Sequence, residues 1–403
     1  MTTHRVVSTT LLASLSLTAL AAPAASAAAT DPWVRTWGAN AVGQLGNATT
    51  TTQPTPGDVT GLARTDVRKL SGGGDDKNAF ALALLADGTV KSWGANASGQ
   101  LGNGTTTNQS VPTTVAGLSG ISAADAGSDH GLAVRKGRVH AWGSNAKGQL
   151  GNGLTEDDKT GMKKTPVVVQ ALDEVKDVGA GCQFSVALRQ DGTVWTWGDG
   201  SKGRLGTGPG KDDETANDSR NTPQQIKDLT DIAAISVGCS HVLALTVDGN
   251  VKAWGEGTNG MLGNDAVANA LAPVDVKLLK GVKSVSAGTY NSFAILNEGE
   301  VKAWGKNDFG QLGDGTTTSR TTPVPIDKLK GTKSIIGGVD FTLAAQPDGS
   351  VLTLGNNDAF QLGDGTNTAT TATTDHAPAT ALPSNSGITR VAVTTSGKSA
   401  YAY

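Results

Sequence analysis

The chain has 403 residues, including 54 glycines and 14 prolines; 17% of the residues are charged and the formal net charge is −3. A nearly neutral chain without long basic blocks argues against nucleic-acid binding and against attraction to an anionic membrane surface. Only 4% of the residues are aromatic, and glycine, threonine and asparagine dilute the helix formers. The composition therefore favours many short β-strands.

The first residues are typical of a secretory signal peptide. His4 and Arg5 precede an apolar run over residues 6–22, and small residues permit cleavage after Ala27 or Ala29. Hydroxyl side chains interrupt this run, and no other stretch approaches the roughly 18 apolar residues of a membrane span. We expect residues 1–29 to be a signal peptide, residues 30–403 to be one domain, and the protein to be secreted into the extracellular space of a bacterium, free of the membrane.

A Trp-Gly dipeptide recurs along the chain at intervals of roughly 50 residues, the signature of a repeat architecture. Its members begin at Trp37, Trp93, Trp142, Trp197, Trp254 and Trp304, with Leu354 as a degenerate seventh. Each is followed by Gly-Gln-Leu-Gly or a variant of it, and is preceded by a glycine-containing turn, most often Asp-Gly. The sequence thus contains seven units.

Each unit has the pattern of a four-stranded antiparallel sheet. Asp-Gly pairs supply the positive φ angles of two-residue hairpins, and residues 80–85 and 89–93 on either side of Asp87-Gly88 are strand-length. A short strand such as 175–179 precedes this hairpin, and a proline-marked segment such as 112–115 suits an outermost edge strand. Seven such units predict an all-β, seven-bladed β-propeller.

The two ends of the chain are expected to complete one blade together. Residues 388–403 supply only the first two strands of a unit, and residues 31–38 have the pattern of the missing third strand. Pairing of these segments would close the ring and cover sheet edges that are otherwise exposed.

The repeat resembles a known family. The segment 178–188, continued through 191–198 to 203–206, is similar to the regulator of chromosome condensation repeat, which implies a seven-bladed propeller. The family includes nuclear exchange factors for a small GTPase and a secreted bacterial propeller that inhibits β-lactamases. Because one fold carries several activities, the resemblance leaves the function open.

Motifs that suggest catalysis or cofactor binding do not fit this pattern. Residues 198–203 and 255–260 match the spacing of a dinucleotide-binding loop, and residues 392–399 match a relaxed phosphate-binding loop. Each belongs to a repeat turn rather than to the start of a helix, which such loops require. The sequence has no Gly-x-Ser-x-Gly, His-Glu-x-x-His or paired Cys-x-x-Cys motif. We therefore expect neither an enzyme nor a bound metal or cofactor.

Two of the histidines have a structural explanation. Alignment of the units by their turns places seven residues at one equivalent position: Phe80, His130, Phe184, His241, Asn291, Phe341 and Lys398. His130 and His241 are two blades apart in this ring, with no carboxylate partner in it, so we do not expect them to share a metal.

The two cysteines occupy the same position in adjacent units. Cys182 and Cys239 each precede their Trp-Gly tryptophan by 15 residues. At about 8 Å from the propeller axis, neighbouring positions would be about 7 Å apart, the upper limit for a disulfide. An oxidising compartment favours a disulfide over the alternative of two buried thiols.

Two neighbouring units carry insertions on the face that holds the cysteine turns, at residues 154–164 and 208–221. Their charged residues are Glu156, Asp157, Asp158, Lys159, Lys211, Asp212, Asp213 and Glu214. These insertions are either solvated loops or a raised patch for a partner, with a calcium site as a weaker alternative.

The leading hypothesis is a monomeric, non-catalytic propeller that binds an unidentified extracellular protein through this face, such as an enzyme. Guanine-nucleotide exchange, implied by the family, is an alternative. Another is carbohydrate or cell-wall binding by Thr-Asn loops such as 105–108 and 316–319.

Overall fold

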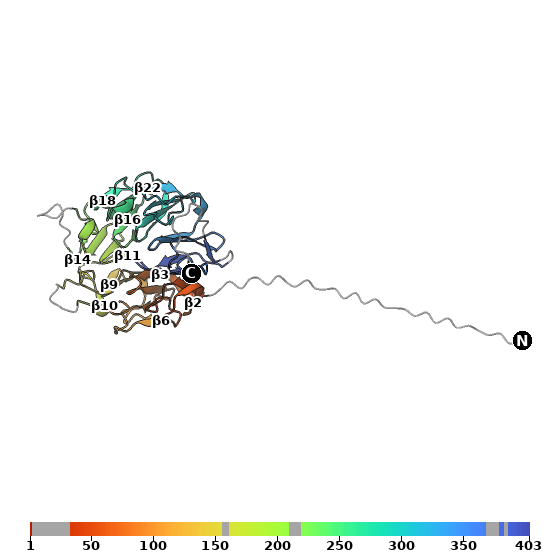
Figure 1. Cartoon of the computed structure of the whole chain (residues 1–403). Helices are drawn as coiled ribbons and strands as arrows, with labels where there is room; N and C mark the ends of the chain where they lie inside the picture. Colours follow the sequence, from red (N-terminus) through yellow and green to blue (C-terminus); the bar gives the residue numbers. More distant parts are fainter. Residues whose placement is uncertain (2–32, 155–160, 209–218, 368–378, 383–385) are drawn as a thin grey trace. The chain divides into compact units, whose positions relative to one another are not determined.

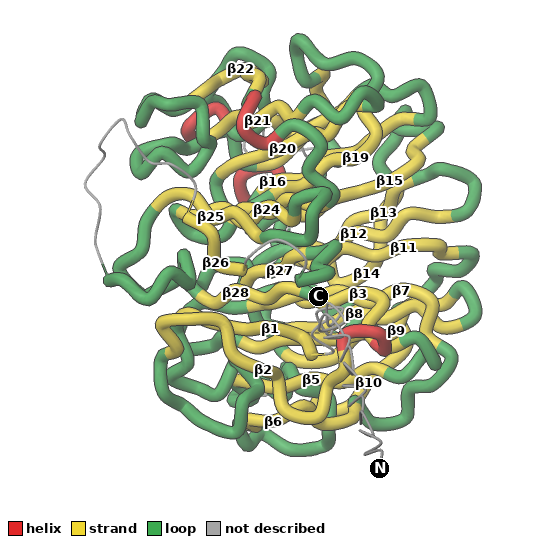
Figure 2. The backbone as a smooth tube through the Cα atoms, turned by 90° about the vertical axis from the view of Figure 1, so that its right-hand side faces the viewer, coloured by secondary structure: helices red, strands yellow, loops and turns green. Residues whose placement is uncertain are grey.

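The computed structural model of the protein describes residues 1, 33–154, 161–208, 219–367, 379–382 and 386–403. Residues 1–30 are a unit separate from the compact unit Asp31–Tyr403. The proposed signal peptide lies outside the described residues. Among the described residues of the compact unit, all regular structure is β-strand apart from four single turns of 3₁₀ helix, η1 (Arg64–Asp66), η2 (Ser201–Gly203), η3 (Thr258–Gly260) and η4 (Asp327–Leu329) (Figure 2).

Seven four-stranded antiparallel sheets form the blades of a propeller (Figure 1). Blade 1 consists of β3 (Val67–Gly73), β4 (Phe80–Leu85), β5 (Val90–Gly94) and β6 (Gln109–Thr114). Blade 2 consists of β7 (Ile121–Ala126), β8 (His130–Arg135), β9 (Arg138–Gly143) and β10 (Lys163–Val168). Blade 3 consists of β11 (Val175–Ala180), β12 (Phe184–Arg189), β13 (Val194–Gly198) and β14 (Arg220–Gln225).

The next three blades repeat this order. Blade 4 consists of β15 (Ile232–Val237), β16 (His241–Thr246), β17 (Val251–Gly255) and β18 (Ala270–Asp275). Blade 5 consists of β19 (Val282–Ala287), β20 (Asn291–Leu296), β21 (Val301–Gly305) and β22 (Arg320–Pro325). Blade 6 consists of β23 (Ser334–Gly337), β24 (Phe341–Ala345), β25 (Val351–Gly355) and β26 (Ala379–Leu382).

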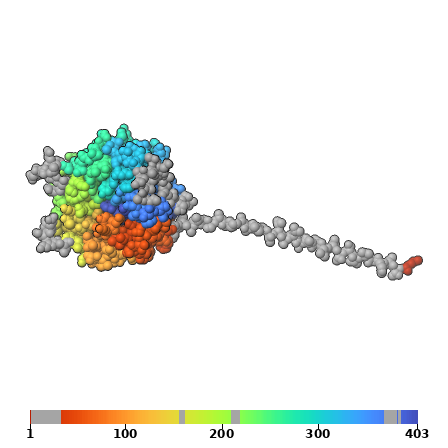
Figure 3. All heavy atoms as spheres, viewed as in Figure 1, coloured from red at the N-terminus to blue at the C-terminus, as the bar shows by residue number. Residues whose placement is uncertain are grey.

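Blade 7 confirms the predicted closure. Its strand order is β2 (Gln53–Ala63), β1 (Trp33–Gly38), β28 (Ser399–Ala402) and β27 (Val391–Val393). The N-terminal part of the described chain supplies the fourth strand as well as the third. The innermost strands contact one another from β3 round to β27, and β27 contacts β3. The ring is therefore closed, and in the space-filling view the sequence colours follow one another from blade to blade (Figure 3).

The turns behave as the sequence predicts. Gly88, in the Asp-Gly turn of blade 1, has a φ of 79° and donates its N–H to the Leu85 carbonyl at 3.0 Å. Residues 198–203 and 255–260, which match the spacing of a dinucleotide-binding loop, contain the 3₁₀ turns η2 and η3. The segment 392–399 is the hairpin between β27 and β28, with four residues between Thr394 and Ser399.

One alignment is corrected. Gly38 pairs with Ser399, whereas the glycine after each tryptophan in the other blades pairs with the equivalent residue, as Gly143 does with His130. Ser399, not Lys398, therefore belongs to the aligned ring position. The reason is that the turn before β28 is longer than its counterparts. Four residues lie between Thr394 and Ser399, whereas only two lie between Gly127 and His130 in blade 2.

Each tryptophan of the Trp-Gly repeat fastens its blade to the preceding one. Trp93 donates its indole N–H to the Gln44 carbonyl of blade 7 at 2.8 Å. The same bond recurs for the other five tryptophans, to the carbonyls of Gln361, Gln100, Gln149, Arg204 and Met261. Gly46, two residues after Gln44, has a φ of 68°, and a Cβ there would lie 2.7 Å from the Trp93 indole nitrogen. The Gly-Gln-Leu-Gly element of one blade thus packs against the tryptophan of the next blade and accepts its hydrogen bond.

Replacing Trp37 by alanine tests this link at the closure. Trp37 is fully buried and donates to the Gln361 carbonyl at 2.9 Å, so the substitution leaves a cavity and an unpaired carbonyl. We expect Trp37→Ala to lower the free energy of unfolding by about 3–5 kcal/mol in urea titrations. Trp195→Ala removes a half-buried tryptophan from the same type of strand and should cost less than half as much. Equal losses would contradict the role given to Trp37.

Candidate functional site

In each blade, a turn connects the innermost strand to the second strand. These turns gather around the axis on one face of the propeller. We call this the cap face, because the turn 394–398 of blade 7 lies over the mouth of the central channel there. Thr395 donates its backbone N–H and its hydroxyl to the Gly72 carbonyl of blade 1, at 3.1 and 2.7 Å. Thr289 of blade 5 donates to the Thr395 carbonyl. The turn is thus held from two sides of the mouth.

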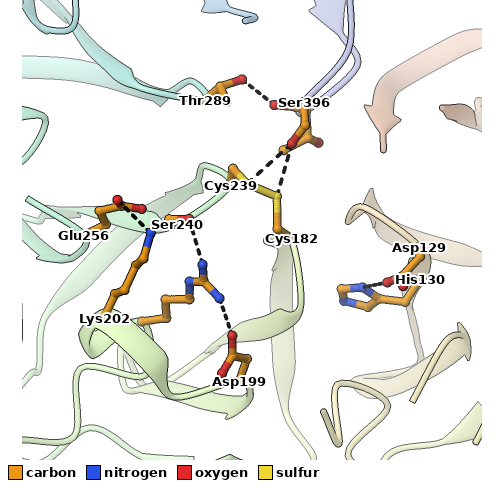
Figure 4. The surroundings of a disulfide bond; sticks show 12 residues. Asp129, His130, Cys182, Asp199, Lys202, Cys239, Ser240, Glu256, Thr289 and Ser396 are labelled. Carbon is orange, nitrogen blue, oxygen red and sulfur yellow. Dashed lines mark hydrogen bonds and ion pairs between the residues drawn. A yellow bond between two sulfur atoms is a disulfide. The ribbon is translucent and has the colours of Figure 1, made fainter. Parts of the chain in front are cut away.

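Cys182 and Cys239 form a disulfide beside this turn (Figure 4). Their Cα atoms are 4.6 Å apart, closer than the expected 7 Å. A backbone hydrogen bond of 3.0 Å from the Cys182 N–H to the Cys239 carbonyl draws the two turns together. The Ser396 hydroxyl lies 3.3 Å from Cys182 Sγ and 3.5 Å from Cys239 Sγ. The bridge links blades 3 and 4, and closing a loop of this length is worth about 4 kcal/mol in the chain-entropy model.

Ion pairs between loops of neighbouring blades surround the cap. The pairs are Lys202–Glu256 at 2.8 Å, Lys306–Asp340 at 2.8 Å and Lys398–Asp358 at 2.7 Å. Burial alone would raise the pKa of Glu256, but hydrogen bonding to the Lys202 ammonium holds it below its ordinary value. Burial opposes the charge of Lys306, yet its Asp340 partner raises the pKa of the ammonium. Glu256 and Lys306 therefore stay charged at neutral pH.

An aromatic residue is exposed within this rim. Tyr290 is 37% exposed, in the turn between β19 and β20. The Lys306 ammonium lies 5.4 Å from the centre of its ring and 6.0 Å from that of Phe309. Such a cation–π arrangement fixes the tyrosine while leaving one side of it accessible. Tyr290 is not part of any predicted motif, but it lies in the turn of blade 5 that is equivalent to the cysteine turns of blades 3 and 4, and hence on the cap face.

The structure describes only the bases of the two insertions. The Gly153 N–H donates to the Asn221 carbonyl at 2.9 Å, and the Asn221 side-chain amide donates to the Leu154 carbonyl at 3.2 Å. The insertions therefore start side by side, as expected for neighbouring blades, and Leu154 is 47% exposed. The candidate binding residues Glu156, Asp157, Asp158, Lys159, Lys211, Asp212, Asp213 and Glu214 lie outside the described residues.

His130 and His241 are buried and each faces a serine of the next blade. His130 Nε2 lies 3.0 Å from Ser185 Oγ, and His241 Nε2 lies 2.8 Å from Ser292 Oγ. In the blades that have phenylalanine in place of the histidine, the residue of the next blade that is equivalent to the serine is Gly131, Val242 or Ala400. The histidines are thus hydrogen-bonded parts of the blade interface. Among the residues that the structure describes, no group of three or more His, Cys, Asp or Glu side chains is arranged to hold a metal.

The channel contains charges that the sequence analysis did not identify. In a cavity of about 430 Å³, Lys69 lies 3.1 Å from Asp125, close to Asp177. Burial alone would lower the pKa of Lys69, but the two carboxylates raise it above its ordinary value. Burial raises the pKa of Asp177. The three residues lie on the inner strands of blades 1, 2 and 3.

The buried histidines predict a pH-dependent loss of stability. Burial lowers the pKa of His130 to about 3 and that of His241 to about 4, whereas the unfolded chain has histidine pKa values near 6.5. Their contribution is complete above pH ~6.5 and falls as the pH drops towards the folded values, because only the unfolded chain then binds the proton. Between pH 7 and pH 5 each histidine should cost about 2 kcal/mol.

The double substitution His130→Phe with Ser185→Ala reproduces the apolar pair of other blades. In urea titrations it should remove about 2 kcal/mol of the loss between pH 7 and pH 5. An unchanged pH dependence would show that His130 is not buried in its neutral form. The pair His241→Phe with Ser292→Ala repeats the test at the second site.

No helix among the described residues is long and apolar enough to cross a membrane. Residues 159–403 match the family model of the RCC1-like domain, and residues 34–75 and 87–134 match the model of the regulator of chromosome condensation (RCC1) repeat.

Among curated proteins, the chain is similar to the human E3 ubiquitin-protein ligase HERC2, 33% identical over 51% of this chain and 4% of that protein. It is also similar to the ultraviolet-B receptor UVR8 of Arabidopsis thaliana, 29% identical over 57% of this chain and 50% of the receptor. The match thus spans half or less of these relatives.

Among solved structures, Prp20p of Saccharomyces cerevisiae has a TM-score of 0.76 at 20% identity, covering 93% of this chain and 92% of that one. Human WBSCR16 has a TM-score of 0.75 at 20% identity, covering 92% and 99%. These likenesses concern the fold. The family models match more than half of the sequence and show that the chain belongs to the regulator of chromosome condensation (RCC1) repeat family.

Proposed function

We propose that the chain is a secreted, non-catalytic propeller that binds an extracellular protein, such as an enzyme, through the cap face. The observation that carries this proposal is the exposed Tyr290 on a face whose rim is fixed by ion pairs and whose centre is closed by the turn 394–398. Solved relatives of the same fold are described with protein partners: Prp20p with binding properties to Gsp1p and histones, and yeast RCC1 in complex with Kap60.

The composition of the rim suits recognition of a protein surface. Tyrosine is enriched among residues that dominate binding energy, because it buries a large rigid area and keeps a polar end. The pairs Lys202–Glu256 and Lys306–Asp340 hold fixed charges next to the exposed aromatic ring. Charges fixed in this way favour partners that carry a complementary pattern of charge, and they speed the association of the two proteins.

The non-catalytic part of the proposal rests on the same pairs. A general acid or base works best with a pKa near the operating pH. The pKa of Glu256 lies below the ordinary value of a glutamate, and the pKa of Lys306 lies above that of a lysine. Both shifts therefore move the pKa further from neutral pH. This is the behaviour of ion pairs that stabilise and present a surface.

The adjacent bases of the insertions extend the proposed surface. Leu154 is exposed beside Asn221, and the charged residues 156–159 and 211–214 follow in the chain from these bases. We propose that the insertions contribute contacts around the better-anchored centre formed by Tyr290. Secretion, which the N-terminal sequence indicates, would place this face in the culture medium.

A quantitative pull-down with matched variants tests the proposal. The immobilised mature protein is compared with Tyr290→Ala, and with a variant in which residues 155–160 and 209–218 are replaced by short Gly-Ser linkers, using culture medium of the source bacterium. We expect a specific protein partner whose recovery falls at least ten-fold with both cap-face variants.

The control is Val247→Ser with Leu278→Ser, which removes two exposed apolar side chains, 65% and 69% exposed, from the opposite face. This variant should recover the partner within two-fold of the wild-type amount. Unchanged recovery by both cap-face variants, or loss with the control alone, would contradict the assigned face.

A further inference from the structure

A second pocket lies on the face opposite the cap, at the other mouth of the channel. It has a volume of about 580 Å³ and lies where the starts of β3 and β11 meet the segment before β27. Five cationic residues line it: Arg64, Arg68, Lys69, Lys176 and Arg390. Asp177 is the one acidic side chain among the described residues of this lining, which also includes the last residue of the sequence, Tyr403.

The positive charge of this pocket is largely uncompensated. Arg64 donates to the Ser386 carbonyl at 2.5 Å, and Arg390 donates to the Arg68 carbonyl. Lys176 lies 3.4 Å from the Ile232 carbonyl. A carbonyl orients a cation without neutralising it.

Lys69 is different, because it is already paired with Asp125 at 3.1 Å. It also lines the channel cavity, as do Asp177, Thr389, Arg390 and Tyr403. Among the described residues, no ion pair to a carboxylate is found for Arg64, Arg68, Lys176 or Arg390. Four like charges held around one mouth repel one another, so an anion bound between them would relieve that repulsion.

The arrangement also indicates the class of anion. The cations come from three separate stretches of the chain: residues 64–69, residue 176 and residue 390. A tetrahedral oxyanion presents oxygens in several directions and meets donors from different sides, whereas a carboxylate presents two oxygens in one plane. Three of the four unpaired cations are arginines, whose planar forks bind phosphate oxygens in pairs.

We propose that this pocket, which we call the basal anion site, binds a small phosphate-bearing ligand through Arg64, Arg68, Lys176 and Arg390. The site lies on the face opposite the proposed protein-binding surface and does not depend on it. A ligand there would contact blade 7, blade 1 and blade 3, so it would also reinforce the closure of the ring.

Isothermal titration calorimetry with inorganic pyrophosphate tests the site on the full mature protein. The test variant is Arg68→Gln with Lys176→Gln, because both side chains are exposed and their removal should leave the fold intact. The control variant is Lys227→Gln with Lys280→Gln, which removes two exposed lysines from blade connections of the same face. Both variants change the net charge equally, and urea titration of each verifies folding.

We expect wild-type protein to bind one pyrophosphate per chain, with affinity reduced at least ten-fold in the test variant and within two-fold in the control. Citrate, a polycarboxylate of similar charge, should bind more weakly than pyrophosphate. Absence of pyrophosphate binding by the wild-type protein, or equal weakening in the two variants, would overturn the site. Citrate binding as tight as that of pyrophosphate would overturn the assignment to phosphate.

Discussion

The pairing of β1 with β28 is the constraint on which the rest of the molecule depends. Trp37 pairs with Ala400 and Thr36 with Tyr401, so residues more than 350 positions apart share one sheet. Because each blade buries both faces against its neighbours, an unpaired blade 7 would expose two apolar faces and a sheet edge at once. The closed ring positions the cap face and the opposite mouth of the channel.

The contacts between blades are specific as well as apolar. The indole of each Trp-Gly tryptophan donates to a carbonyl of the preceding blade, as Trp93 does to Gln44, while His130 meets Ser185 of the following blade. The disulfide between Cys182 and Cys239 adds a covalent link at the centre of the cap face. Directional bonds of this kind fix the angle between adjacent sheets, and hence the positions of the loops they carry.

Much of this architecture was predictable because it is repeated. The Trp-Gly spacing and the Asp-Gly turns identify seven units, and the incomplete last unit predicts the closure by residues 31–38. The proximity of Cys182 and Cys239 also followed from their equal positions in adjacent units. The Cα distance was overestimated, because the backbone hydrogen bond that draws the two turns together cannot be seen in a repeat alignment.

The candidate sites were less predictable because they arise where the repeat is broken. Lys398 was misaligned by one residue, since the turn before β28 is longer than its counterparts. The exposure of Tyr290 depends on which side of its turn faces solvent, which spacing does not reveal. The basal anion site combines Arg64 and Arg390, which are separated by most of the sequence and are brought together by ring closure. Single charged residues at non-equivalent positions give no periodic signal.

Native-state hydrogen exchange, read by mass spectrometry on peptides covering residues 33–38 and 399–402, tests the closure most directly. Chain ends that are merely apposed fray with free energies near zero, whereas elements of a cooperative core exchange only by global unfolding. We expect the amides of β1 and β28 to exchange as slowly as those of β16 and β17 in blade 4. Rapid exchange of β1 and β28, with blade 4 still protected, would contradict a ring held shut by this pair of strands.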